Sequence, residues 1–300
     1  MQIYLNRLIQ NQYFQLILHL ISPLVDILLF IFIIICNNIK RICFEVYLLF
    51  TRLPPTQAWM DPREQELVVK YIQKLKRERS EQKISMVEYG AGSSTFFFST
   101  YVDYYVSIEH SPHYCRELER MAISQPHRSV KIFYMGRNSS GFYIKHCFEQ
   151  KPDKLNLTSH IEIYCVPRNA YSFKAYYLWA TSKRSTYTMY RDYVDFLSIY
   201  FRNTKFDFAF LDGRARPQVA YAILKQLNGL NAKVFIHDWN QRKEYHIIER
   251  EFYNIIDQQI ESTQSGGGGL VVLHRKSEGI GEKNINDIDW KYGKEPEWWI

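Results

Sequence analysis

The sequence predicts an α/β fold: a doubly wound, mainly parallel sheet with helices on both faces. Short β-branched or aromatic runs alternate with helical runs between residues 61 and 276. Several of these strands are apolar throughout, as strands buried on both faces are. A glycine hinge from Ser265 to Gly269 precedes a last apolar strand, Leu270 to Leu273. A long apolar segment near the amino terminus adds a transmembrane helix to this prediction.

The amino-terminal segment from Phe14 to Cys36 is apolar apart from a few polar residues. About 20 such residues cross a bilayer. Asp26 costs about 3 kcal/mol there, which the surrounding Ile, Leu and Phe offset. A cleaved signal peptide is the alternative, but Cys36-Asn37-Asn38 makes a poor cleavage site. We therefore expect residues 1–52 to form a single-pass membrane anchor and a juxtamembrane segment.

Two features of the sequence give opposite indications of the side of the membrane on which the folded domain lies. Three basic residues follow the anchor, against one basic residue and the amino group before it: Lys40, Arg41 and Arg52 against Arg7. Positive-inside counting then favours a cytosolic domain. Two glycosylation sequons, Asn138-Ser139-Ser140 and Asn156-Leu157-Thr158, would matter only in a lumenal domain.

Residues 53–280 are expected to form the folded domain. Its first helix begins at Asp61-Pro62-Arg63-Glu64, a capping box with proline at the first helical position. Apolar residues then recur at helical spacing up to Leu75. A strand at residues 86–89 leads into the glycine turn Gly90-Ala91-Gly92, and a helix begins at Ser93-Ser94-Thr95.

A second strand, Tyr104 to Ile108, ends in Glu109. An acidic side chain about 20 residues after a glycine turn is placed to accept hydrogen bonds from ribose hydroxyls. Glycines let the backbone approach a ligand closely, and hydroxyls at a helix start can bind it. The sequence therefore predicts a cofactor site at Glu88, Gly90, Gly92, Ser94 and Glu109.

These segments, together with Phe206 to Gly213 and Val234 to Asp238, resemble the class I S-adenosylmethionine-dependent methyltransferases. The resemblance covers roughly residues 61–276. It implies a Rossmann-like sheet with a C-terminal antiparallel hairpin around the glycine run, and S-adenosyl-L-methionine as cofactor. It implies that Glu88, Gly90 and Gly92 surround the methionine part and that Glu109 holds the ribose. The third strand, Ile161 to Val166, ends at Pro167, so the family's acidic adenine contact has no assigned residue here.

The rest of the domain continues the alternation. Residues 125–160 are long, polar and without clear period, and we interpret them as an insertion, either a lid or a peripheral excursion. The later elements expected are helices at 190–201, 217–227 and 243–257 and strands at 206–211, 233–236 and 270–273. Residues 281–300 form an aromatic tail.

The chemistry is expected at the carboxyl ends of the strands. His237 has the ordinary pKa of a general base, and Asp212 is the alternative base or a residue that orients the substrate. Arg214 and Arg216 could clamp a carboxylate or phosphate of the substrate. Asp212 and Asp238 also resemble two metal-ligating aspartates of the catechol O-methyltransferase branch, but Trp239 stands where that branch has an asparagine, so we expect no metal.

Composition limits the partners. The formal net charge is +7, without a concentrated basic stripe, so no nucleic acid is expected. The five cysteines are scattered and odd in number, without a CxxC pair, and predict packing roles or free thiols. The leading hypothesis for the function is a membrane-tethered methyltransferase that acts on an oxygen of a small molecule, lipid or glycan. The first alternative is an inactive methyltransferase-like binding module at a membrane. An NAD-dependent enzyme is disfavoured because a third glycine is missing near Thr95.

Overall fold

The computed structural model describes residues 58, 60–152, 160–169, 187–240, 242, 245–259 and 268–277. All of them belong to the second of two units into which the chain divides, after Pro54. The expected anchor at residues 14–36 and the aromatic tail at 281–300 lie outside the described residues. Within the described residues, no helix combines the length and apolar character needed to cross a membrane.

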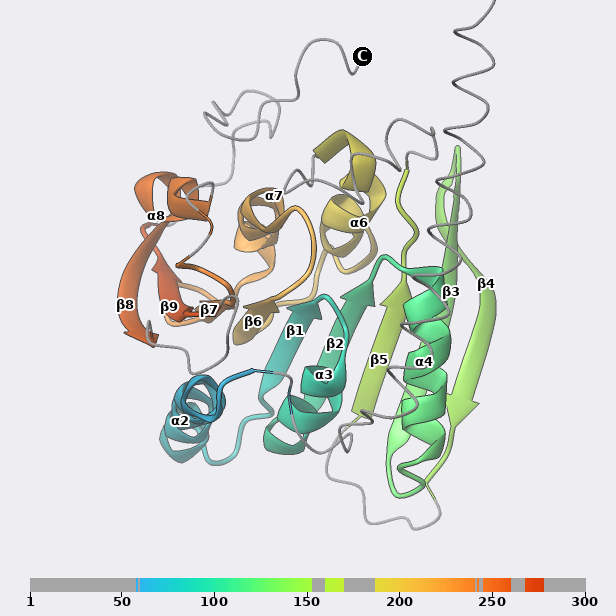
Figure 1. Ribbon diagram of the computed structural model, residues 1–300, viewed down its shortest axis with the longest axis horizontal. Helices are drawn as coiled ribbons and strands as arrows, with labels where there is room; N and C mark the ends of the chain where they lie inside the picture. Colours follow the sequence, from blue (N-terminus) through green and yellow to red (C-terminus); the bar gives the residue numbers. More distant parts are fainter. Residues whose placement is uncertain are drawn as a thin grey trace, which may run out of the picture. The chain divides into compact units, whose positions relative to one another are not determined.

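The domain is built on one nine-stranded sheet in the order β4-β3-β5-β2-β1-β6-β7-β9-β8 (Figure 1). The six strands from β3 to β7 in this order run parallel, whereas β4, β9 and β8 are joined by antiparallel pairing. The strands are β1 Ser85–Tyr89, β2 Tyr104–Glu109, β3 Ser129–Asn138, β4 Gly141–Gln150, β5 His160–Cys165, β6 Phe208–Leu211, β7 Lys233–Ile236, β8 Tyr253–Gln259 and β9 Leu270–Arg275. This arrangement confirms the mixed α/β sheet and the C-terminal antiparallel hairpin.

Helices cover both faces of the sheet. The described helices are α2 Pro62–Glu78, α3 Ser93–Phe98, α4 Pro112–Ile123, α6 Tyr187–Tyr200, α7 Arg216–Ala222 and α8 His246–Glu251, with short 3-10 turns η1 Ser99–Tyr101 and η2 Ile223–Gln226. Successive strand residues point to opposite faces. Met86 therefore belongs to the core with α2, α3 and α4, and Val87 to the core with α6 and α7.

Helix α2 begins as its sequence predicts. The Asp61 side chain accepts a hydrogen bond from the Arg63 amide at 2.9 Å, and the Asp61 amide donates to Glu64 Oε2 at 3.1 Å. This reciprocal capping fixes the first turn. It also buries Glu64 completely, which becomes important at the site.

The segment at residues 125–160 is largely ordered sheet. Strands β3 and β4 form an antiparallel hairpin, and β3 pairs in parallel with β5, so the hairpin extends one edge of the main sheet. Residues 153–159 lie outside the described residues. The hairpin thus gives regular structure to a segment whose sequence has no clear period. Strand β4 is exposed on both faces, so its sequence carries no alternation of apolar and polar residues.

The helix expected at residues 243–257 is also wrong in its second half. Helix α8 ends at Glu251, and β8 follows from Tyr253 to pair with β9. Alternating burial along β8 shows the two-residue period of a strand. The apolar residues Tyr245, Ile248, Phe252 and Ile255 fit a helical spacing by coincidence, and pairing with β9 decides the outcome.

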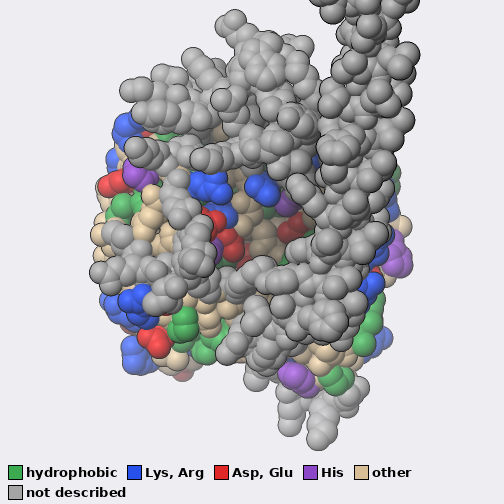
Figure 2. Space-filling view, viewed as in Figure 1, with side chains coloured by type: hydrophobic (Ala, Val, Ile, Leu, Met, Phe, Trp, Pro, Cys, Tyr) green, Lys and Arg blue, Asp and Glu red, His purple; other side chains and the backbone are tan. Residues whose placement is uncertain are grey.

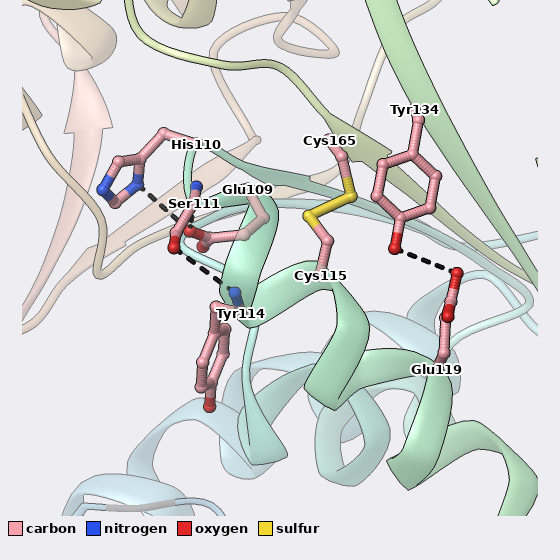
Figure 3. Close-up of a disulfide and its surroundings, with 8 residues drawn as sticks. All are labelled: Glu109, His110, Ser111, Tyr114, Cys115, Glu119, Tyr134 and Cys165. Carbon is pink, nitrogen blue, oxygen red and sulfur yellow. Dashed lines mark hydrogen bonds and ion pairs between the residues drawn. A yellow bond between two sulfur atoms is a disulfide. The ribbon is translucent and has the colours of Figure 1, made fainter. Parts of the chain in front are cut away.

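The expectation of unlinked cysteines is wrong for one pair. Cys115 of α4 and Cys165 of β5 form a disulfide (Figure 3). Cys147 is a free, exposed thiol. Both linked cysteines are buried. The bond fastens helix α4 to the carboxyl end of β5, beside Glu109 at the end of β2, which is paired with Cys165.

Replacement of both linked cysteines by serine should lower the free energy of unfolding by about 2–5 kcal/mol, because the bond closes a long loop. Urea unfolding of the Cys115→Ser/Cys165→Ser variant measures the loss. Cys147→Ser is the matched control, since an exposed thiol contributes within about 0.5 kcal/mol. Equal stability of the double variant and this control would contradict the bond's structural role.

Candidate functional site

The glycine turn after β1 lies at the point where the sheet order reverses. Strand β1 pairs with β2 on one side and with β6 on the other. Ligands of open α/β sheets bind at such a switch point, beyond the carboxyl ends of the strands. The Gly90 amide donates to the Ile108 carbonyl at 2.9 Å, and the Asp212 amide donates to the Tyr89 carbonyl at 2.9 Å. These bonds hold the ends of β1, β2 and β6 together.

Gly90 and Gly213 allow the two loops at this point to touch. Gly90 has a φ of +97°, and a Cβ there would lie 2.5 Å from the Gly213 nitrogen. A Cβ on Gly213 would lie 2.0 Å from the Tyr193 hydroxyl. No other residue fits Gly90 without strain, because both the dihedral angle and the backbone contact exclude a side chain. Gly90 is therefore required for the contact between the two loops at the ends of β1 and β6, whether or not a ligand binds there.

Gly92 and Ser94 stand at the start of α3. The Gly92 amide donates to Thr95 Oγ1 at 2.9 Å, and Gly92 itself is extended, with ordinary space around it. Ser94 is nearly buried, and its hydroxyl donates to Glu88 Oε1 at 2.5 Å. The hydroxyl predicted to bind a cofactor is thus committed to Glu88 in this conformation.

Glu88 is completely buried and serves the turn internally. Its carboxylate accepts hydrogen bonds from Ser94, Thr95 and Ser107. Burial raises the pKa of Glu88 to about 7, although the three hydroxyls oppose the shift. The prediction that Glu88 surrounds a cofactor is therefore not supported by its position, because its oxygens face the protein interior. It fixes the glycine turn from beneath.

Glu109 ends β2 beside His110 (Figure 3). Its Oε1 accepts from the Ser111 amide at 2.7 Å and lies 3.2 Å from His110 Nδ1. Burial raises the pKa of Glu109 to about 8, against the opposing backbone N–H groups. Burial together with Arg214 and Arg168 lowers the pKa of His110 to about 3. Both side chains are then mainly uncharged at neutral pH.

His237 follows β7 and lies between carboxylates. Its Nδ1 is 3.0 Å from Asp212 Oδ1, and its Nε2 is 3.3 Å from Glu64 Oε2. Burial alone disfavours the charged ring, but Asp212, Glu64 and Asp238 outweigh it and raise the pKa of His237 to about 10. Each ring nitrogen faces an acceptor, as in a doubly protonated imidazole.

This geometry argues against His237 as a general base, because a ring that already holds both protons accepts no other. Burial acts to raise the pKa of Asp212, but His237 and Arg216 outweigh it and hold that pKa below its ordinary value. Asp212 is therefore a weak base that stays ionised. Its side chain is 29% exposed, which leaves it able to orient a substrate.

Arg216 is buried within the same network. Its Nη2 lies 2.8 Å from Asp212 Oδ1 and 3.1 Å from Asp238 Oδ2, and its guanidinium also donates to backbone carbonyls, including that of His237. The prediction that Arg216 clamps a substrate is wrong, since its donors are taken up by the protein. Arg214 is partly exposed in the same loop and carries charge close to Glu109.

Asp212, His237 and Asp238 bring one potential ligand atom each within 4.8 Å of one another. Arg216 and the protonated His237 already neutralise these two aspartates. A cation would have to displace both of them, so the donor set does not fit a metal as it stands. Asp238 has a φ of +57°, an uncommon conformation that turns its carboxylate toward Arg216.

Figure 2 shows acidic and basic side chains close together, over the carboxyl ends of the central strands as seen in Figure 1. Two residues of the site, Glu64 and His110, were not predicted from the sequence. Glu64 was recognised only as a helix cap, yet it reaches His237 and accepts from the Gly269 amide at 2.7 Å. His110 stands next to Glu109 in the sequence, and that adjacency was the signal available.

No protein-family model matches the chain, and no curated protein matches it. Among solved structures, a methyltransferase-like protein from Silicibacter pomeroyi is similar, with 15% sequence identity and a TM-score of 0.43. The match covers 73% of this chain and 89% of that chain. At this identity and TM-score the likeness supports no conclusion about activity or substrate.

The two glycines of the turn should respond differently to alanine. Gly90→Ala should lower the free energy of unfolding by about 2 kcal/mol or more, because its methyl group meets backbone at a positive φ. Gly92→Ala is the matched control and should change stability by only a few tenths of a kcal/mol. Thermal unfolding of both variants decides this, and equal losses would contradict the assigned backbone contact.

Stability should fall as pH rises from 6.5 to 9. The pKa values of Glu88, Glu109 and His237 are raised on folding, so the folded state binds protons that the unfolded state has released. The stability they add is present at low pH and is lost as pH climbs through about 7, 8 and 10. His110, with its lowered pKa, acts only below pH 6.5.

Melting temperatures of the wild type and His237→Gln across this pH range measure the effect. The variant should show a shallower decline, because one of the raised groups is gone. A wild-type melting temperature that is constant or rises with pH would disprove the assigned protonation states.

Proposed function

We propose that this protein is a membrane-tethered S-adenosylmethionine-dependent methyltransferase that methylates an oxygen of a small molecule, lipid or glycan. The observation that carries the proposal is Glu109, a buried carboxyl at the end of β2 beside the glycine turn of the switch point. An acidic group at this place accepts hydrogen bonds from ribose hydroxyls.

The site has chemistry suited to the cofactor. The pKa of Glu109 is raised to about 8 by burial, so its carboxylate lacks enough donors in the protein alone. Two ribose hydroxyls would supply such donors. Gly90, with its positive φ, leaves the turn without a side chain next to Asp212 and Gly213. The sheet, with β9 antiparallel beside β7, has the terminal hairpin that the resemblance implies.

S-adenosylmethionine, when bound, would supply a methyl group on a sulfonium: the acceptor oxygen would bond to the methyl carbon while the C–S bond breaks in line and the sulfur leaves as a neutral thioether. The protein's contribution is to position that oxygen and to exclude water. Asp212 is ionised and partly exposed at the end of β6, and we propose that it orients the acceptor hydroxyl. Arg214, from the same loop, is proposed to attract an acidic group of the substrate.

An inactive binding module is the second candidate, and one observation favours it. The protonated state of His237 and the lowered pKa of Asp212 leave no strong general base among the sequence-predicted catalytic residues. An acceptor that needs its proton removed would then turn over slowly. Methyl transfer assays separate this module from an enzyme once binding is established.

An NAD-dependent enzyme is disfavoured further. Thr95 occupies the place near the missing third glycine, and its hydroxyl bonds both the Gly92 amide and Glu88. The Thr95 side chain thus stabilises the glycine turn at the place where a dinucleotide-binding turn has a glycine for close helix–strand packing. The proposed tether at residues 14–36 lies outside the described residues and stays a prediction.

Isothermal titration with S-adenosylmethionine tests the cofactor assignment. Glu109→Gln should weaken binding about 10- to 100-fold, which corresponds to the roughly 1.5–3 kcal/mol of a hydrogen bond to a charged group. Wild-type affinity should rise between pH 6.5 and 8.5, because the ribose hydroxyls need the ionised carboxylate, and Glu109→Gln should lose this dependence. Glu117→Gln in α4 is the matched control, because Glu117 is a partly buried carboxyl that pairs with Arg120. No binding by the wild type, or equal binding by Glu109→Gln, rejects the cofactor.

A further inference from the structure

The hairpin of β3 and β4 carries a glycosylation sequon at its tip. Strand β3 ends at Asn138 and β4 begins at Gly141, so Ser139 and Ser140 form the turn. Residues 137 to 140 are exposed. Asn138-Ser139-Ser140 satisfies the acceptor pattern, with no proline in the middle position.

The first and third residues of the sequon are joined by hydrogen bonds. Asn138 Oδ1 accepts hydrogen bonds from the Ser140 amide at 3.0 Å and from the Ser140 hydroxyl at 2.7 Å. Both bonds use the amide oxygen and not the nitrogen that would carry a sugar. Gly141 has only open space around the position of a Cβ. A bulky group on Asn138 would therefore project from the hairpin without disturbing the sheet.

The disulfide is an independent observation about the compartment. Cys115 and Cys165 are buried and joined within the folded core. Structural disulfides persist in oxidising environments such as the lumen of the secretory pathway and are rare where thiols are kept reduced. The domain that holds this bond is therefore expected on the side of the membrane where N-linked glycans are added.

We propose that Asn138 is an N-glycosylation site and that the folded domain faces the lumenal or extracellular side of a membrane, an orientation that rests on the proposed tether. In the transfer, the Asn138 side-chain nitrogen forms a bond to the anomeric carbon of an oligosaccharide and loses one proton. The bond from that carbon to a lipid diphosphate breaks, and the diphosphate leaves with the bonding electron pair. No redox change is involved.

This orientation reverses the one favoured by charge counting. That count compared three basic residues after the anchor with one basic residue and the amino group before it, a difference of one charge. So small a bias is weak guidance to orientation. A disulfide and an exposed sequon on the same domain both favour the other side.

The experiment uses the full chain, expressed in cultured eukaryotic cells and digested with peptide N-glycosidase F. The Asn156→Gln background removes the second sequon, so any mobility shift in it reports Asn138. We expect that shift, and we expect it to disappear when Asn138→Gln or Ser140→Ala is added. Ser139→Ala is the matched control and should keep it, because the middle position accepts any residue except proline.

No shift in the Asn156→Gln chain overturns the proposal, as does a shift that survives Ser140→Ala. A second measurement addresses the compartment directly. Thiol labelling of the denatured wild-type chain should increase after reduction, whereas labelling of the Cys115→Ser/Cys165→Ser variant should not. Equal labelling of the wild type before and after reduction would show that the bond is absent in the cell and would overturn the assigned compartment.

Discussion

The site depends on one buried set of charges that joins four elements. Glu64 of α2 and Asp212 after β6 face the two ring nitrogens of His237 after β7, and Arg216 of α7 pairs with both Asp212 and Asp238. Three carboxylates thus surround two cations in a largely buried position. Removal of one partner from such a set leaves an uncompensated charge and costs about 3–5 kcal/mol. The network therefore fixes the ends of the central strands.

The same interactions reduce the catalytic options. His237, which the sequence predicts to be a base, is a cation at neutral pH because Asp212 and Glu64 face its two ring nitrogens. Arg216, which the sequence predicts to bind the substrate, instead donates hydrogen bonds to backbone carbonyls of the protein. On the other side of β1, Glu109 is buried and His110 is partly buried, and both are mainly uncharged at neutral pH. The charged network and the carboxyl proposed to hold the ribose thus lie on opposite sides of β1.

Local signals in the sequence predict the elements whose stability is local. The capping box of α2, the apolar runs of β1, β6 and β7 and the glycine turn are of this kind, and each is found. Long-range pairing decides the elements that were missed. Strand β8 exists because β9 is beside it, the β3–β4 hairpin because β5 offers an edge, and the disulfide because α4 lies against β5. The sequence could not reveal the contact between Glu64 and His237 for the same reason, because the two residues are far apart in the chain. The role predicted for His237 therefore differs from the one that its position allows.

The disulfide connects the fold, the site and the compartment. Cys165 pairs in register with Glu109, and Cys115 lies in the helix that begins just after it, so the bond holds both sides of the proposed ribose carboxyl. An oxidising compartment would then secure the binding half of the site as well as the fold. It would also place the methyl acceptor among molecules of that compartment. The proposed tether and lumenal side would place the domain beside lipid and glycan acceptors, so extracts of these two classes are the first substrates to assay.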